Sequence, residues 1–164
     1  MIDADLAGPV DEHKALAHPL RLRILAMLGK EPQYVCQITT VLHSAVSTVS
    51  THLAVMKDAG LAIETREGRW VRYALSDRGA QFYSFHREEL TAGRDVIADS
   101  AILAIVRTIP REDLCQASLD FRKLRNSELI ALARKYRRLG KGRIPEAAPQ
   151  GCGHQEAAKE NRKD

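Results

Sequence analysis

Short hydroxylated side chains gather in one stretch of this 164-residue chain, and cationic side chains follow them closely. Small hydroxyl-bearing residues let a helix approach the base edges of DNA, and lysine and arginine bind its phosphates. These residue types at this spacing therefore support non-covalent recognition of nucleic acid. The candidate contacts are Ser47, Thr48, Ser50 and Thr51, followed by Lys57, Arg66, Arg69 and Arg72.

His52 lies within the same stretch, and its role has two open interpretations. An imidazole on the hydroxylated face would donate a hydrogen bond to a phosphate. Alternatively, the ring fills a packing gap between helices.

Three cysteines, Cys36, Cys115 and Cys152, offer a second kind of chemistry. They lie far apart, and an odd number of thiols argues against a disulfide framework. Because glycines flank Cys152, we expect that thiol to be exposed. The thiols are therefore either small buried side chains or reactive ligands.

Helical periodicity predicts the elements that position these groups. The proline of His18-Pro19 separates a first helix from a second, and Gly29 ends the second. Ser44 is placed to cap the fourth helix, whose inward face is predicted to hold Val46, Val49, Leu53 and Met56. The four predicted helices cover residues 9–17, 19–28, 35–42 and 44–59.

After residue 60 the period changes to that of a strand. Residues 61–66 and 69–75 flank Glu67-Gly68, a pattern typical of a β-hairpin with a tight turn. Helical spacing returns over residues 77–108, where an apolar stripe must pack against the rest of the domain or against a second protomer. The stripe consists of Ile97, Ala101, Ile102, Ile105 and Ile109.

These elements predict a mainly α fold with a small β-hairpin, the winged helix-turn-helix, with helical dimerisation elements and an extended C-terminal region. The expected division is a DNA-binding and dimerisation domain over 1–108, a helical extension over 109–140 and a flexible tail over 141–164. A further helix is predicted around 127–139. The net charge of +4 comes mainly from the basic segment 121–143, which either clamps flanking phosphates or forms a solvated helix face.

Four motifs together resemble the arsenic-repressor (ArsR) family of bacterial winged-helix regulators. They are Lys14-Ala-Leu-Ala-His-Pro-Leu-Arg-Leu-Arg-Ile-Leu, Ser47-Thr-Val-Ser-Thr-His-Leu, Ala59-Gly-Leu and Arg66-Glu-Gly-Arg-Trp-Val-Arg-Tyr. The resemblance, over about residues 10–76, implies a homodimeric repressor that binds a palindromic double-stranded operator and leaves it when an inducer binds. It implies that Ser47, Thr48, Ser50 and Thr51 contact DNA, and that DNA binding needs no cofactor.

The resemblance also suggests an inducer. Arsenic-responsive members carry Cys-Val-Cys where this chain has Tyr34-Val35-Cys36, and soft ions such as As(III) or Sb(III) prefer thiolates. A trigonal site would need Cys36 together with Cys115 and Cys152. Zinc-type members pair an Asp-X-His with a His-X-X-Glu or a His-X-X-His. His86 and Glu89 match only the second half, so a solvated helix face is expected there. Another metal, or oxidation of a cysteine pair, stays open as the signal.

Other classes of protein fit less well. The chain has no Gly-X-Ser-X-Gly, Walker loop, His-Glu-X-X-His or Cys-X-X-Cys motif, so no enzyme is expected. It has neither a secretory signal nor an apolar run long enough to span a bilayer, so a cytoplasmic protein without membrane contact is expected. A winged helix that binds only protein is an alternative that the hydroxylated face and the arginines disfavour.

Overall fold

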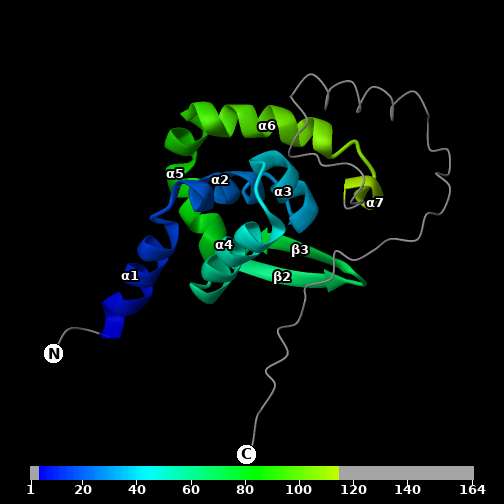
Figure 1. Ribbon diagram of the computed structural model, residues 1–164. Helices are drawn as coiled ribbons and strands as arrows, with labels where there is room; N and C mark the ends of the chain where they lie inside the picture. Colours follow the sequence, from blue (N-terminus) through cyan, green and yellow to red (C-terminus); the bar gives the residue numbers. More distant parts are fainter. Residues whose placement is uncertain (1–3, 115–164) are drawn as a thin grey trace, which may run out of the picture.

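The computed structural model describes residues 4–114, which form a helical body with a small sheet at one side (Figure 1). Cys115, Cys152, the predicted helix 127–139, the basic segment 121–143 and the predicted tail lie outside the described residues. The helices are α1 (Ala4–Leu16), α2 (Pro19–Leu28), α3 (Val35–Leu42), α4 (Val46–Asp58), α5 (Asp77–Ala92), α6 (Arg94–Val106) and α7 (Arg111–Leu114). The strands are β1 (Gln33–Tyr34), β2 (Ala62–Glu67) and β3 (Trp70–Leu75).

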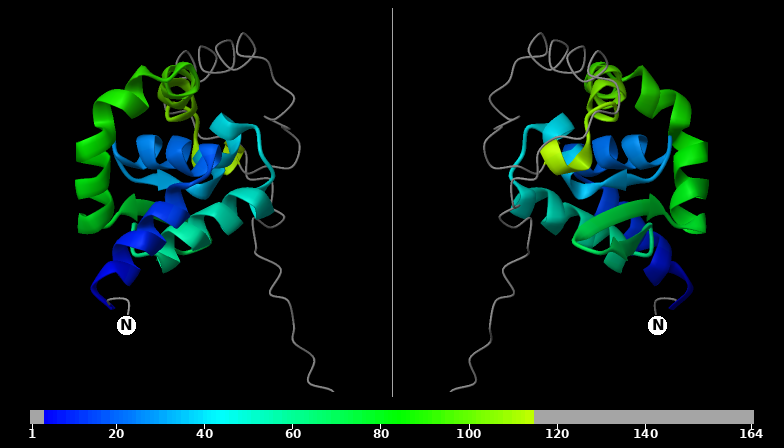
Figure 2. Two further views of the ribbon diagram at one scale, coloured as in Figure 1. Left: turned by 90° about the vertical axis from the view of Figure 1, so that its left-hand side faces the viewer. Right: turned by 90° about the vertical axis from the view of Figure 1, so that its right-hand side faces the viewer.

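Helices α2 and α3 lie at the centre of the body (Figure 1). Helix α6 crosses them on one side, and α4 and the sheet lie on the opposite side, while α1 projects away from the body. Figure 2 shows α5 running along one flank, between the sheet and α6. The core fills the space between these helices, with fully buried side chains that include Ile24, Leu25, Ile38, Val41, Val49, Leu53, Met56, Leu61 and Val106.

Local sequence explains where the central helices begin. Pro19 occupies the first turn of α2, and the Nδ1 atom of His18 accepts a hydrogen bond from the Leu20 amide at 3.1 Å. Helix α3 starts where the Tyr34 amide donates to Oε1 of Gln37 at 2.9 Å. A turn with His43 at a φ of 50° then leads into α4. This helix-turn-helix arrangement, followed by a hairpin, confirms the predicted winged fold.

The sheet is antiparallel with strand order β1-β3-β2. Strands β2 and β3 form a hairpin, called the wing from here on (residues 62–75), in which Glu67 pairs with Trp70. The turn residues are Gly68 and Arg69, one position later than predicted, and Gly68 has a φ of 62° that favours glycine. The sequence pattern did not predict β1, which pairs Gln33 with Tyr73 and Tyr34 with Arg72.

Two ion pairs join helices that are far apart in the sequence. Arg23 on α2 donates to both carboxylate oxygens of the buried Asp99 on α6, at 2.6 Å each. Arg78 on α5 donates to both oxygens of Glu12 on α1, at 2.7 Å each, and this lowers the pKa of Glu12. The first pair holds α6 against α2, and the second holds α5 against α1.

Several local expectations were wrong. Helix α1 begins at Ala4, earlier than predicted. Ala45 precedes α4 as its cap residue, while the Ser44 hydroxyl donates to the Leu42 carbonyl; Val46 is 47% exposed instead of inward. The change of cap residue and the exposure of Val46 have one cause, a turn that continues to residue 45. Only the later apolar residues of α4 therefore lie on its inner face.

The segment 77–108 is two helices, because the backbone at Gly93 is extended and ends α5. Of the predicted stripe, Ile102 and Ile109 are buried, whereas Ile97 and Ala101 are exposed. The buried face of α6 instead consists of Val96, Asp99, Ile102, Leu103 and Val106. Asp99 belongs to this buried face because its carboxylate pairs with Arg23. Among the described residues, the helices are too short or too polar to cross a membrane.

Candidate nucleic-acid interface

Helix α4 presents most of the predicted hydroxylated face to solvent. Ser47, Thr48 and Thr51 are exposed, and the Thr51 hydroxyl donates to the Ser47 carbonyl at 3.0 Å. The opposite face of α4 packs into the core through Val49, Leu53 and Met56. The helix is thereby held rigidly, with a surface of small polar side chains that fits the major groove of B-DNA.

Ser50 differs from the other three hydroxylated residues. Its side chain is half-buried, and its hydroxyl oxygen is buried without a hydrogen-bond partner among residues 4–114. The structure therefore places Ser47, Thr48 and Thr51 together on the open surface and turns the Ser50 hydroxyl away from it.

Glu64 on β2 organises the cations nearest to α4. Its carboxylate accepts from Lys57 Nζ at 2.9 Å and from the Tyr73 hydroxyl at 3.0 Å, and Arg66 Nε lies 3.4 Å away. The hydrogen bond from Lys57, followed by that from Tyr73, lowers the pKa of Glu64. Lys57 and Arg66 must break their contacts with Glu64 before they can bind a phosphate of the DNA backbone.

The remaining predicted cations are Arg69 in the turn of the wing and Arg72 on β3. Arg69 is exposed and its guanidinium lies 4.7 Å from the ring centroid of Trp70. Arg72 Nε pairs with Oε1 of Glu67 at 2.9 Å. Arg69 is thus free of a carboxylate contact within the described part of the chain, while Arg72 is already paired.

His52 faces the body instead of open solvent. Its ring lies 4.4 Å from that of His18, centroid to centroid, and its Nδ1 atom is 3.4 Å from Nη1 of Arg21. Burial, together with the charges of His18 and Arg21, lowers the pKa of His52. This geometry favours the packing interpretation of His52 over direct donation to a phosphate.

A pH-dependent contribution to stability follows from His52. Folding lowers the pKa of His52 from 6.5, so the unfolded chain takes up a proton more readily than the folded chain. The contribution of His52 to the free energy of unfolding is therefore complete above pH 6.5. It is lost as the pH falls through the pKa of His52 in the folded protein. We expect His52→Gln to destabilise the protein more at pH 7.5 than at pH 5.5, measured by urea unfolding at both pH values. An equal loss at both would contradict this role.

Cys36 is the second residue of α3 and is half-buried. Its backbone carbonyl accepts from the Thr40 hydroxyl at 2.8 Å. Within residues 4–114, no three His, Cys, Asp or Glu side chains gather closely enough to hold a metal ion. A trigonal thiolate site at Cys36 would therefore take its other two ligands from beyond residue 114 or from a second copy of the chain.

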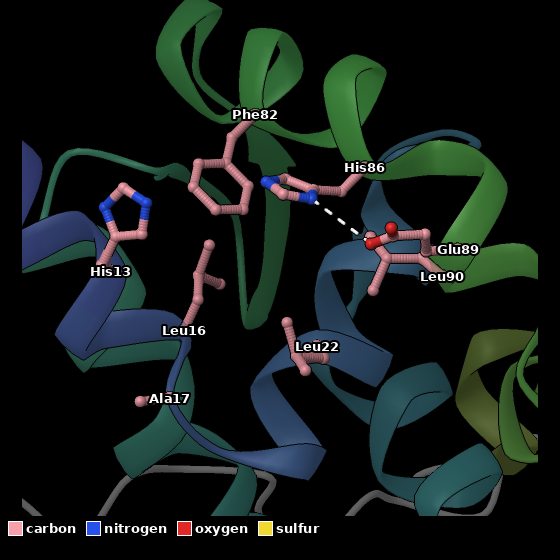
Figure 3. A pocket seen from close by; sticks show the side chains of 8 residues that line it. All are labelled: His13, Leu16, Ala17, Leu22, Phe82, His86, Glu89 and Leu90. Atoms are coloured by element: carbon pink, nitrogen blue, oxygen red, sulfur yellow. Dashed lines mark ion pairs between the residues drawn. The ribbon is translucent and has the colours of Figure 1, made fainter.

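A hollow of about 270 Å³ lies between α1, α2 and α5 (Figure 3). Phe82 stacks at a tilt on His86, with centroids 4.6 Å apart, and meets the ring of His13 edge-on at 5.6 Å. His86 Nδ1 is 3.8 Å from Glu89, so the predicted pair is in contact, but His86 is half-buried where a solvated face was expected. The hollow is lined by His13, Leu16, Ala17, Leu22, Phe82, His86, Glu89 and Leu90.

Sequence patterns missed the acidic residues that hold the cations. Glu64 and Glu67 alternate with arginines along the hairpin, and nothing in that alternation shows which carboxylate pairs with which cation. The strand register would have been needed to pair them.

A helix-turn-helix with an exposed hydroxylated second helix and an arginine-bearing hairpin is typical of winged-helix DNA-binding proteins. The model of the bacterial regulatory protein arsR family matches residues 18–64, from just before α2 into β2. The helix-turn-helix of this chain is therefore similar to that of these bacterial regulators.

Individual proteins show the same similarity. The arsenical resistance operon repressor of Escherichia coli K12 is 35% identical over 69 residues, 42% of this chain and 59% of that protein. The HTH-type transcriptional regulator CmtR of Mycobacterium tuberculosis H37Rv is 45% identical over 64 residues, 39% of this chain and 54% of that protein. The chain thus spans little more than half the length of these relatives.

A solved structure, reduced HlyU from Vibrio cholerae N16961, has 32% sequence identity. The likeness covers 51% of this chain and 90% of that chain, with a TM-score of 0.47.

Proposed function

We propose that this protein is a transcriptional repressor that binds double-stranded operator DNA as a homodimer in the cytoplasm and leaves it when an inducer binds. The inducer that we propose is a thiol-binding metalloid, As(III) or Sb(III). No cofactor takes part in DNA binding itself.

One observation carries the DNA-binding part of the proposal. Ser47, Thr48 and Thr51 form an exposed, small and polar face on a helix whose other face is buried. The wing follows directly and carries exposed Arg66 and Arg69. A helix in the major groove with cations beside it satisfies both base readout and phosphate binding.

The homodimer is supported by apolar side chains that α1 and α5 leave exposed. Leu6 is 56%, Val10 46% and Phe85 86% exposed. Large apolar side chains on neighbouring helices are typical of a surface that another protein covers. Pairing through these helices would place two copies of α4 about 34 Å apart, one turn of DNA.

Selection of binding sites from a random duplex pool tests this function. The full chain is expected to enrich a palindrome whose half-sites are centred about 10 bp, or a multiple of that, apart. A pool without any enriched sequence would favour a winged helix that binds only protein.

The inducer is tested with Cys36→Ser. Arsenite is expected to weaken operator binding by wild-type protein about 5- to 150-fold, the usual range of such coupling, and to leave the variant unaffected because its thiolate ligand is gone. The assay is anisotropy of a labelled operator, with a phosphine reductant because dithiols bind arsenite. Normal release from the variant would remove Cys36 from the site.

Cys115→Ser and Cys152→Ser in the same assay identify the other ligands. If arsenite and antimonite leave wild-type binding unchanged, other metal ions and a peroxide are the next additions, since a cysteine pair also responds to oxidation. The relative named as an arsenical resistance repressor supports testing arsenite first.

A further inference from the structure

Three side chains converge on one carboxylate at the end of the wing. The Tyr34 hydroxyl donates to Oε2 of Glu67 at 2.6 Å, and Arg72 Nε pairs with Oε1 at 2.9 Å. Nη1 of Arg111 lies 3.6 Å from Oε2. These four residues, called the wing-tip cluster from here on, come from β1, the two strands of the wing, and α7.

Arg111 also makes a second kind of contact. Its guanidinium lies 4.4 Å from the ring centroid of Tyr34 and 5.6 Å from that of Trp70. A cation near aromatic rings at these distances is attracted to them, and a planar guanidinium suits this contact better than an ammonium. Helix α7 therefore holds both the carboxylate and the ring surface of the wing.

The wing needs such support. Strand β2 is an edge of the sheet and is paired only with β3, while β1 is two residues long. An isolated two-stranded hairpin is marginally stable in water. In Figure 1 the tip of the wing extends away from the helical body, and α7 lies on the same side of the molecule.

Charge gives the wing-tip cluster a role in DNA binding. An uncompensated carboxylate at the tip of the wing would repel phosphates. Hydrogen bonds and ion pairs from Tyr34, Arg72 and Arg111 compensate the charge of Glu67, while the neighbouring Arg69 stays exposed.

We propose that Tyr34 and Arg111 are positioning residues that hold the wing in its DNA-binding orientation through Glu67, so that α7 belongs to the DNA-binding unit. This rests on the proposed DNA-binding function and extends it to a helix that lies beyond the residues matched by the family model. Arg111 acts here through Glu67 and Trp70, without touching DNA itself.

Tyr34→Phe and Arg111→Gln test the proposal in the full-length chain. Arg107→Gln is the matched control, since Arg107 also pairs with a carboxylate, that of Glu31, which is not part of the wing-tip cluster. Tyr83→Phe is the control for the loss of a hydroxyl. Trp70 is the single tryptophan, so its emission reports the wing tip directly. Acrylamide, a neutral quencher, avoids a bias from the altered charge.

We expect both test variants to raise acrylamide quenching of Trp70 in the free protein by about 1.5- to 2-fold. We expect them to weaken operator binding about 5-fold, the size of the loss of one ordinary hydrogen bond. The controls should match wild type in both readouts. Melting temperatures identify any variant that has unfolded.

Two results would overturn the proposal. One is test variants whose quenching and affinity equal those of the controls. The other is unchanged quenching together with a slope of log affinity against log salt concentration that is smaller by about one. That result would make Arg111 a phosphate contact. Because quenching needs no DNA, a wild-type protein that failed to bind any duplex would refute the proposed function while leaving the wing-tip contacts measurable.

Discussion

Replacing Ser47 and Thr48 together with glutamate is expected to reduce operator binding at least about 100-fold, because two carboxylates would enter a groove lined by phosphates. Both residues are exposed on α4, so the fold should tolerate the change. Anisotropy of a labelled operator measures the affinity, and circular dichroism checks that the helices are retained.

The matched control adds two carboxylates elsewhere. Ala101 and Ala104 are exposed on α6, which lies on the far side of α2 and α3 from α4 (Figure 1). Ala101→Glu with Ala104→Glu changes the net charge equally, and it should weaken binding only slightly through the general field of the protein. Equal losses from the two double variants would mean that α4 does not face the DNA.

Asp99→Asn is expected to have the largest effect on stability, about 3 kcal/mol, because it leaves the Arg23 charge without its partner in a largely buried place. The Asp99 side chain is 3% exposed and that of Arg23 is 25% exposed. Urea unfolding of the full chain at neutral pH measures the free energy of unfolding.

Glu31→Gln is the control for this second prediction. It removes the same charge from the pair that Glu31 forms with Arg107, whose side chains are 37% and 44% exposed. An exposed pair contributes about 0–1 kcal/mol. If Asp99→Asn costs no more than this control, the Arg23–Asp99 pair does not hold α6 against α2.

The helix-turn-helix and the wing could be predicted from the sequence because their signals are local. The helical period gave the bounds of α3, Val35–Leu42, as the structure has them. The change to strand period located the wing, and Gly68 marked its turn to within one residue. The hydroxylated face of α4 followed from spacing alone, except for Ser50.

Long-range pairs could not be predicted. Arg23 and Asp99 are 76 positions apart, and Arg78 and Glu12 are 66 apart, so no local spacing connects them. Asp99 also interrupts the apolar pattern from which the buried face of α6 was predicted. Strand β1 was missed because two residues are too few to show a period.

The candidate site shows the same limit. The cations of the wing were found by residue type, but their partners Glu64 and Glu67 depend on strand register, and the approach of Arg111 depends on where α7 folds back. His52 was open between two roles until its contacts with His18 and Arg21 were known.

Sequence-specific binding of operator DNA is the property on which the proposed function depends. It is tested most directly by titrating the reduced full-length protein into a labelled duplex taken from immediately upstream of its own gene, and into a scrambled duplex of equal length and composition at the same salt concentration. Binding to the upstream duplex is expected to be at least about 1,000-fold tighter than binding to the scrambled one. Equal affinity for both duplexes would contradict it.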